Sequence, residues 1–137
     1  IPMIPQGTAY SWAHVDDIAA IHIKALEESK PGETYIVAGP TYTLVEALKM
    51  AQEITGIPAP RALPPGLFGT MASVAGLVEP LAKLPDLYTS EGLRVLAGVT
   101  YIGSAAKARR ELGYNPRPLR EGLQETLAHE MKHLGIK

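Results

Sequence analysis

Two short runs of strand-forming residues, each followed by a helix, constrain this chain more than any other feature of its sequence. The first run begins at Tyr10, and within "YSWAHVDDIAAIHIKALE" it becomes helical at the aspartates Asp16 and Asp17. The second run, "TYIVAG" at residues 34–39, has no polar alternation, which is typical of a strand buried on both faces of a parallel sheet. A chain that alternates strand and helix in this way is predicted to be α/β.

The predicted helices have recognisable signals at their ends. One of the two aspartates is expected to cap the first helix. Thr43 and Glu46 form a capping-box pattern for the second helix, and Gly56 is expected to close it. Pro118 opens a last helix that Gly135 stops. Between them the sequence predicts helices at "SEGLRVLAG" and "AAKARREL", separated by a short strand "VTYIG".

Two strands near the start cannot form a stable open sheet, because their edges would remain unpaired. The first predicted helix also indicates that neighbouring elements are missing. Apolar residues such as Ile18, Ile21, Ile23 and Leu26 occupy most of its circumference, and a helix of that kind is covered on more than one side. The chain also begins at Ile1 without an initiator methionine. We therefore expect it to be a piece of a longer protein.

Composition excludes several classes of function. The formal net charge is −1 and the lysines and arginines are scattered, unlike the basic stripe of a nucleic-acid binder. The absence of cysteine excludes disulfides and thiolate metal sites and fits a cytoplasmic location. The uncharged segment at residues 62–78 is interrupted by prolines and glycines, so we expect a buried helix or pocket wall rather than a membrane span. Contact with a membrane surface is an alternative.

Two short motifs imitate known sites. "HEMKH", residues 129–133, matches the zinc motif H-E-x-x-H. However, a third protein ligand is missing, and the helix is predicted to bury its opposite side. "GLFGTMA" imitates a dinucleotide loop, but Pro64 and Pro65 precede it where a strand is required. We expect neither a metal ligand nor a cofactor-binding residue in these motifs. The predicted buried stripe of the last helix comprises Leu119, Leu123, Leu127, Met131 and Leu134.

The opening segment is the remaining candidate for chemistry. Trp12 and His14 alternate with small or apolar residues, so they share a face with Tyr10 that could line a pocket. His22 is predicted to be a hydrogen-bonded core histidine. No serine has a base at a recognisable spacing, and no tyrosine is followed four residues later by lysine. The chain therefore contains no complete catalytic set.

Three blocks carry a resemblance to a known family: "YSWAHVDDIAAIHIKALE", "GETYIVAGPTYTLVEALKMAQEITG" and "YIGSAAKARRELGYNPRPLREGLQET". Together they resemble the C-terminal part of extended short-chain dehydrogenases/reductases, the NAD-dependent epimerase/dehydratase family. The resemblance implies the C-terminal portion of a Rossmann-type doubly wound fold plus a mostly helical substrate domain. It assigns residues 1–57 to the last strand-helix-strand-helix of the nucleotide-binding sheet and residues 58–137 to the substrate-binding region.

The family's glycine-rich loop and catalytic tyrosine and lysine lie in an N-terminal half that is not in this chain. The resemblance therefore implies NAD or NADP for the whole protein, with no catalytic residue and no tight cofactor binding in this chain alone. The expected partners are that missing half, or a second copy at the exposed sheet edge, and a small-molecule substrate. The alternative is a non-catalytic, truncated interaction or oligomerisation module.

Departures from the family narrow the expected substrate. Nucleotide-sugar members usually carry an arginine four residues before the histidine of this motif, where this chain has Tyr10. A pocket without cations cannot compensate a desolvated diphosphate. The chain is thus more similar to dihydroflavonol-reductase-like members, which implies a small, relatively apolar carbonyl or alcohol. The predicted pocket walls are Tyr10, Trp12, Phe68 and Tyr101.

Overall fold

The computed structural model describes residues 3–78, 89–91 and 100–136. Its described strands form two separate two-stranded sheets rather than one open sheet. In the first sheet β1 (Met3–Pro5) runs parallel to β4 (Arg61–Leu63), with Ile4 opposite Ala62. In the second sheet β2 (Ala9–Ser11) runs antiparallel to β3 (Thr41–Thr43).

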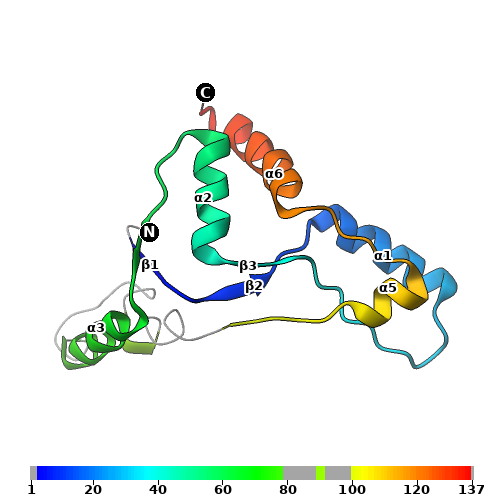
Figure 1. The fold of residues 1–137 in the computed structure, drawn as a ribbon, viewed down its shortest axis with the longest axis horizontal. Helices are drawn as coiled ribbons and strands as arrows, with labels where there is room; N and C mark the ends of the chain where they lie inside the picture. Colours follow the sequence, from blue (N-terminus) through cyan, green and yellow to red (C-terminus); the bar gives the residue numbers. More distant parts are fainter. Residues whose placement is uncertain (1–2, 79–88, 92–99, 137) are drawn as a thin grey trace.

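The described helices form three groups around these strands (Figure 1). One group is α2 packed against α6, and a second is α1 packed against α5. The third is α3 alone, which lies at the opposite end of the molecule from α1 and α5. The helix bounds are Val15–Glu28 for α1, Leu44–Thr55 for α2, Pro65–Val78 for α3, Ala106–Leu112 for α5 and Leu119–Leu134 for α6.

Two clusters of buried apolar residues lie toward opposite ends of the molecule. Phe68, Ala72 and Ala75 of α3 form a small cluster that packs against Met3 and Leu63 of the parallel sheet. A larger cluster joins α1, α5 and the residues 35–38 that precede β3. Its buried members are Ile21, Ala38, Ala105, Ala108, Leu112 and Tyr114.

The predicted helix ends of α2 and α6 are confirmed. The Thr43 hydroxyl accepts the Glu46 amide at 3.2 Å, and the Glu46 carboxylate accepts the Thr43 amide at 2.7 Å. This is the capping box, and it uses donors that the first helical turn leaves unpaired. Gly56 ends α2 at a φ of 73°, a left-handed conformation that glycine adopts without steric cost. Pro118 and Gly135 flank α6 as predicted.

The predicted strand at residues 34–39 is not a strand in this structure. Strand assignment requires a hydrogen-bonded neighbour, and the part of the chain that the structure describes offers none beside this segment. Tyr35, Val37 and Ala38 instead pack into the larger cluster, while Ile36 remains 57% exposed. The predicted strand "VTYIG" is reduced to an isolated parallel bridge between Tyr101 and Tyr10.

The apolar circumference of α1 is covered on one side only, counting the residues that the structure describes. Ile21 is buried, whereas Val15, Ile23 and Leu26 are 70%, 60% and 87% exposed. At 100° per residue these three exposed positions fall within about 80° of one another, so they form one outward stripe. The expectation that α1 is covered on more than one side is therefore not met within this chain.

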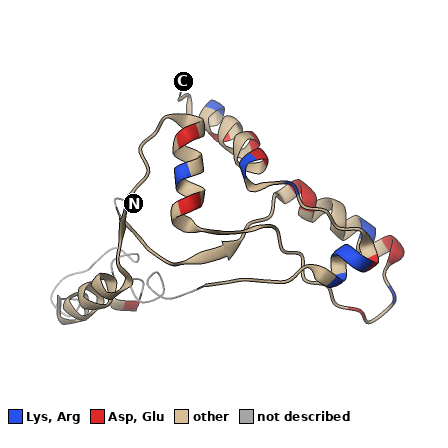
Figure 2. Cartoon of the chain, in the orientation of Figure 1, with Lys and Arg blue, Asp and Glu red and all other residues tan. Residues whose placement is uncertain are grey.

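The uncharged segment at residues 62–78 forms β4 and α3, as expected for a helix, but one side of that helix is exposed. Phe68 is buried, while Leu67 and Leu77 face solvent. No charged residue lies on α3, whereas acidic and basic residues occur along the other helices (Figure 2). None of the described helices combines the length and apolar character that crossing a membrane requires. The predicted helix at "SEGLRVLAG" falls largely outside the described residues.

Candidate functional site

The junction between β2 and α1 is tied to the start of α6 by an ion pair. The Arg117 side chain donates from Nε to Asp17 Oδ1 at 2.9 Å, and the Arg117 backbone amide donates to Asp17 Oδ2 at 2.9 Å. A second guanidinium nitrogen, Nη1, lies 2.6 Å from a carboxylate oxygen of Glu125 on α6. One arginine thus links two carboxylates from opposite ends of the chain.

The surroundings of Asp17 favour its ionised form. Burial by itself raises the pKa of this carboxyl, but the hydrogen bonds and positive charge of Arg117 outweigh burial, so the pKa lies below its usual value. The same pairing raises the pKa of the Arg117 guanidinium. Both groups are therefore charged at neutral pH, and each neutralises the other.

His14 caps α1, in place of the predicted aspartates. Its Nδ1 accepts the Asp16 amide at 3.3 Å. Asp16 and Asp17 do not cap because the helix already begins at Val15, which places them at its second and third positions. Since Nδ1 accepts, the neutral ring carries its proton on Nε2. Nε2 lies 3.7 Å from a carboxylate oxygen of Glu125, which is too far for a direct hydrogen bond.

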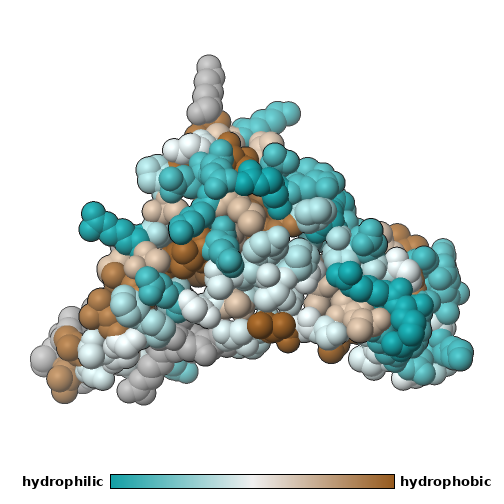
Figure 3. Space-filling model, in the orientation of Figure 1, coloured by the Kyte–Doolittle hydropathy of each residue, from teal (hydrophilic) through white to brown (hydrophobic). Residues whose placement is uncertain are grey.

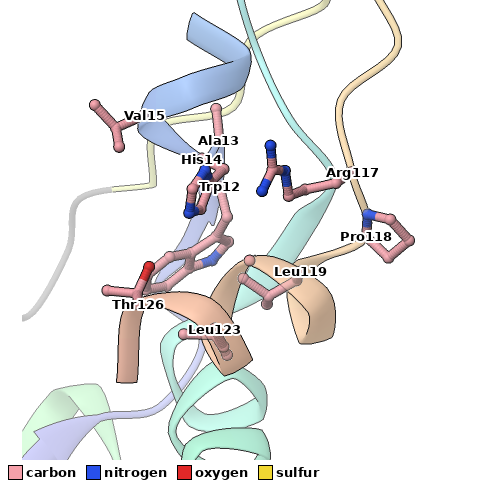
Figure 4. A pocket seen from close by; sticks show the side chains of 10 residues that line it. Trp12, Ala13, His14, Val15, Arg117, Pro118, Leu119, Leu123 and Thr126 are labelled. Carbon is pink, nitrogen blue, oxygen red and sulfur yellow. The ribbon is translucent and has the colours of Figure 1, made fainter. Parts of the chain in front are cut away.

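A pocket opens between this junction and the first turns of α6 (Figure 4). Its volume is about 320 Å³. Trp12 forms one wall and donates its indole N–H to the Tyr42 carbonyl at 3.1 Å, which fixes the ring. Gly122 allows α6 to approach His14, because a Cβ at this position would lie 3.3 Å from the imidazole Cδ2. The other lining residues are Ala13, Val15, Arg117, Pro118, Leu119, Leu123 and Thr126.

His14, Asp16 and Glu125 are the described residues close enough together to hold a metal ion, with ligand atoms within 4.8 Å of one another. Two of these three groups already have partners. The Glu125 carboxylate accepts a hydrogen bond from Arg117, and the Nδ1 of His14 accepts a backbone amide. The motif at residues 129–133 contributes to no such group in the described part of the chain. Its two histidines are exposed, and so is Leu134, which the sequence predicts to be in the buried stripe.

The predicted pocket walls fall into two places. Tyr10 stacks on Tyr101 with ring centroids 6.3 Å apart, and Trp12 meets Tyr10 edge-on at 6.0 Å. These three aromatic residues therefore form one continuous group. Phe68 belongs instead to the cluster beneath α3. Of the four, only Trp12 lines the pocket described above.

His22 is hydrogen-bonded as predicted but is not in the core. Its Nδ1 lies 2.7 Å from the Ile18 carbonyl, one helical turn earlier, and its side chain is exposed. The prediction of a core position is wrong because the buried side of α1 runs through Ile21 and Ala25. Sequence reasoning also missed Arg117, which lies 100 positions from its partner Asp17 in a proline-containing loop. No local pattern signals that contact.

No family model matches the chain. Two curated proteins are similar to it. The sterol demethylase protein B of Methylococcus capsulatus is 29% identical over 126 residues, covering 88% of this chain and 37% of that protein. The UDP-glucose 4-epimerase of Corynebacterium glutamicum is 28% identical over 116 residues, covering 82% of this chain and 27% of the epimerase. The chain thus spans well under half the length of these relatives.

Solved structures also match most or all of this chain over less than half of their own length. The crystal structure of gox2253 matches all of this chain with a TM-score of 0.78 and 29% identity, and the match covers 41% of that protein. RMD from Pseudomonas aeruginosa, complexed with NADPH, matches 96% of this chain with a TM-score of 0.60 and 12% identity, over 37% of its own length. UDP-glucuronic acid 4-epimerase from Bacillus cereus, in complex with NAD, matches 89% with a TM-score of 0.54 and 19% identity, over 30% of its own length.

These neighbours define the class of the fold: it is α/β and corresponds to part of a Rossmann-type epimerase or reductase. The resemblance to the extended short-chain dehydrogenases/reductases, the NAD-dependent epimerase/dehydratase family, is confirmed by the same relatives. The chain corresponds to a C-terminal portion of proteins of that family.

Proposed function

We propose that this chain is the substrate-side portion of an NAD(P)-dependent reductase that acts on a small, relatively apolar carbonyl or alcohol. In the whole protein, residues 1–57 complete the nucleotide-binding sheet and residues 58–137 shape the substrate pocket. The cofactor, NAD or NADP, supplies or accepts the hydride. The groups in this chain contribute binding and orientation, and this chain alone neither turns over substrate nor binds the cofactor tightly.

The observation that carries the proposal is the exposed stripe of Val15, Ile23 and Leu26 on α1. Burial of each such side chain stabilises a protein by roughly 1.5–3 kcal/mol. A large apolar stripe on a helix is a common mark of an interface. Its partner in this proposal is the nucleotide-binding half of the protein, which adds the strands that residues 34–39 lack. A second copy of the chain is the competing partner.

The substrate class is inferred from the aromatic group at the β2 strand. Tyr10 occupies the position at which nucleotide-sugar members of the family carry an arginine, and it stacks on Tyr101 beside Trp12. These rings provide apolar area and no positive charge, so they suit an uncharged substrate better than a diphosphate. One relative is named for a sterol, an apolar molecule. Phe68 and the uncharged α3 lie apart from these rings in this chain, and in the proposal they form a separate part of the substrate pocket of the whole protein.

Two measurements test the proposal. In the first, the protein purified from its own cells is analysed by intact mass. It is then assayed for NAD(P)H oxidation with apolar ketones and, by chromatography of the nucleotide sugars, for epimerisation of UDP-glucose in the presence of NAD. We expect a polypeptide longer than 137 residues that turns over the ketones. In the second, the 137-residue chain is titrated with NADH in a calorimeter, and no tight binding is expected. Stoichiometric tight binding, or preferential turnover of UDP-glucose, would contradict the proposal.

A further inference from the structure

The pocket between Trp12 and α6 has the composition of a binding site for a small molecule. Its walls are mostly apolar and include an indole ring, the side chains of Leu119 and Leu123, and the aliphatic ring of Pro118. Pockets for small ligands typically occupy roughly 300–1,000 Å³ and are mainly apolar, with a few polar groups that orient the ligand. At about 320 Å³, this pocket lies at the small end of that range.

The charges around the pocket disfavour an anionic ligand. Among the described lining residues Arg117 is the only arginine or lysine, and its guanidinium is already paired with Asp17 and Glu125. A carboxylate oxygen of Asp16 lies 3.6 Å from His14 Nδ1. An anion would therefore meet carboxylates that exceed the available positive charge. Because the Arg117 guanidinium is already paired, it does not favour an anion over a neutral molecule in the pocket.

One hydrogen-bond donor in the wall is uncommitted. The capping bond to Nδ1 places the His14 proton on Nε2, and no hydrogen bond engages Nε2 among the described residues. The ring is held in place by Gly122 on one side and by its own cap on the other. The His14 side chain is only 10% exposed, so an acceptor that reaches Nε2 would do so inside the pocket. Figure 4 shows His14 and Trp12 among the side chains that line this pocket.

We propose that this pocket binds a neutral, planar molecule of about two fused rings that lies against Trp12 and accepts a hydrogen bond from His14 Nε2. The size follows from comparison with a cavity of roughly 150 Å³, which accommodates benzene. The inference does not depend on the proposed reductase activity, because it requires no cofactor and no other part of a longer polypeptide.

The experiment uses the indole N–H of Trp12, the only tryptophan of the chain, as a single NMR resonance. Quinoline, a two-ring molecule with one acceptor nitrogen that is neutral at pH 7.5, is titrated into the 15N-labelled 137-residue chain. We expect a saturable shift of the Trp12 resonance. Naphthalene has the same shape without the acceptor and should bind several-fold more weakly. The anion 1-naphthoate should bind more weakly than either neutral ring.

Two variants locate the binding. Thr126 is exposed at the pocket wall, so Thr126→Phe should fill the pocket without disturbing the core and weaken quinoline binding at least tenfold. Leu134→Ala alters a separate groove between α2 and α6 and should leave the affinity unchanged. No saturable shift, or equal affinity in Thr126→Phe, would overturn the inference. A Trp12 resonance at the random-coil position would also overturn it, since the indole N–H is bonded to Tyr42 in this structure.

Discussion

Replacement of Gly39 by alanine tests the position with the least room for a Cβ among the described glycines. A Cβ at this position would lie 1.5 Å from the Trp12 carbonyl oxygen and 2.5 Å from its carbonyl carbon. Ordinary contacts of a Cβ begin at 3.4 Å, so the two segments must separate by roughly 2 Å (3.4 − 1.5). The neighbouring hydrogen bond from the Trp12 amide to the Pro40 carbonyl, 3.0 Å long, would then be broken.

The expected cost combines forced backbone displacement with a lost hydrogen bond. Overpacking typically costs about 1–3 kcal/mol and one hydrogen bond about 1 kcal/mol, so we expect Gly39→Ala to lower the free energy of unfolding by roughly 3 kcal/mol. Urea unfolding followed by the fluorescence of Trp12 measures this directly, because that residue lies at the contact itself.

Gly69→Ala is the matched control for this substitution. Gly69 lies inside α3, and nothing is within 4 Å of the position that its Cβ would take. Alanine is favoured over glycine in a helix by about 0.5–1 kcal/mol, so the control should be neutral or slightly stabilising. A Gly39→Ala chain that unfolds within about 0.5 kcal/mol of the unsubstituted chain would refute the reasoning, because surface substitutions without a steric conflict fall in that range.

Three further substitutions test local contacts. Asp17→Asn should destabilise the chain by about 1–3 kcal/mol at neutral pH. The pKa of Asp17 is lower in the folded chain than in the unfolded chain, where it is near 3.8. Urea unfolding across a pH series should therefore show the full loss of unfolding free energy above the unfolded pKa and no loss once the pH falls below the folded pKa. A difference that does not change with pH would contradict this. Thr43→Ala removes the capping box and should cost about 1 kcal/mol by the same assay, whereas no loss would show that the cap is unimportant. Leu26→Ser should change the free energy of unfolding of the 137-residue chain by less than about 0.5 kcal/mol, since Leu26 is exposed. The same substitution should weaken the association of the chain with a nucleotide-binding half in sedimentation experiments. Unchanged association would contradict the proposed interface.

Helix ends were the part of this fold that sequence could predict. The capping groups of α2 lie within four residues of the backbone groups that they bond, namely at Thr43, Glu46 and Gly56. The local sequence therefore contains every group that determines where this helix begins and ends. The cap of α1 shows where this breaks down. Asp16 and Asp17 have the right chemistry to cap, but the helix begins at Val15, so they lie inside its first turn and His14 caps instead. Asp17 pairs with the distant Arg117, and a contact of that kind depends on the tertiary structure, which a local pattern does not contain.

The same distinction applies to the candidate site. Trp12 and His14 were predicted to share a face with Tyr10. Both line the pocket, but so do the intervening Ala13 and the following Val15, whereas Tyr10 does not, so alternation alone does not account for this wall. The opposite wall comes from α6, more than 100 residues later. Sequence alone gave no reason to place Gly122 against His14, since a glycine inside a helix reveals a close approach only once its neighbour is known.

The segment at residues 34–39 connects the failed strand prediction to the proposed interface. Gly103 packs against it, with an added Cβ only 3.0 Å from the Ile36 side chain, and both Ile36 and Ile102 are exposed. The space-filling view shows patches of hydrophobic residues, coloured brown, on the surface of the molecule (Figure 3). An extended, apolar segment without ladder partners is what remains of a buried strand when its neighbour is not part of the chain. We therefore expect the amides of residues 35–38 to exchange rapidly with solvent in the 137-residue chain and to be protected in the longer native protein, where a neighbouring strand accepts their hydrogen bonds. Hydrogen exchange followed by mass spectrometry compares the two. Equal protection would show that this segment gains no partner strand, which would contradict the proposed completion of the sheet.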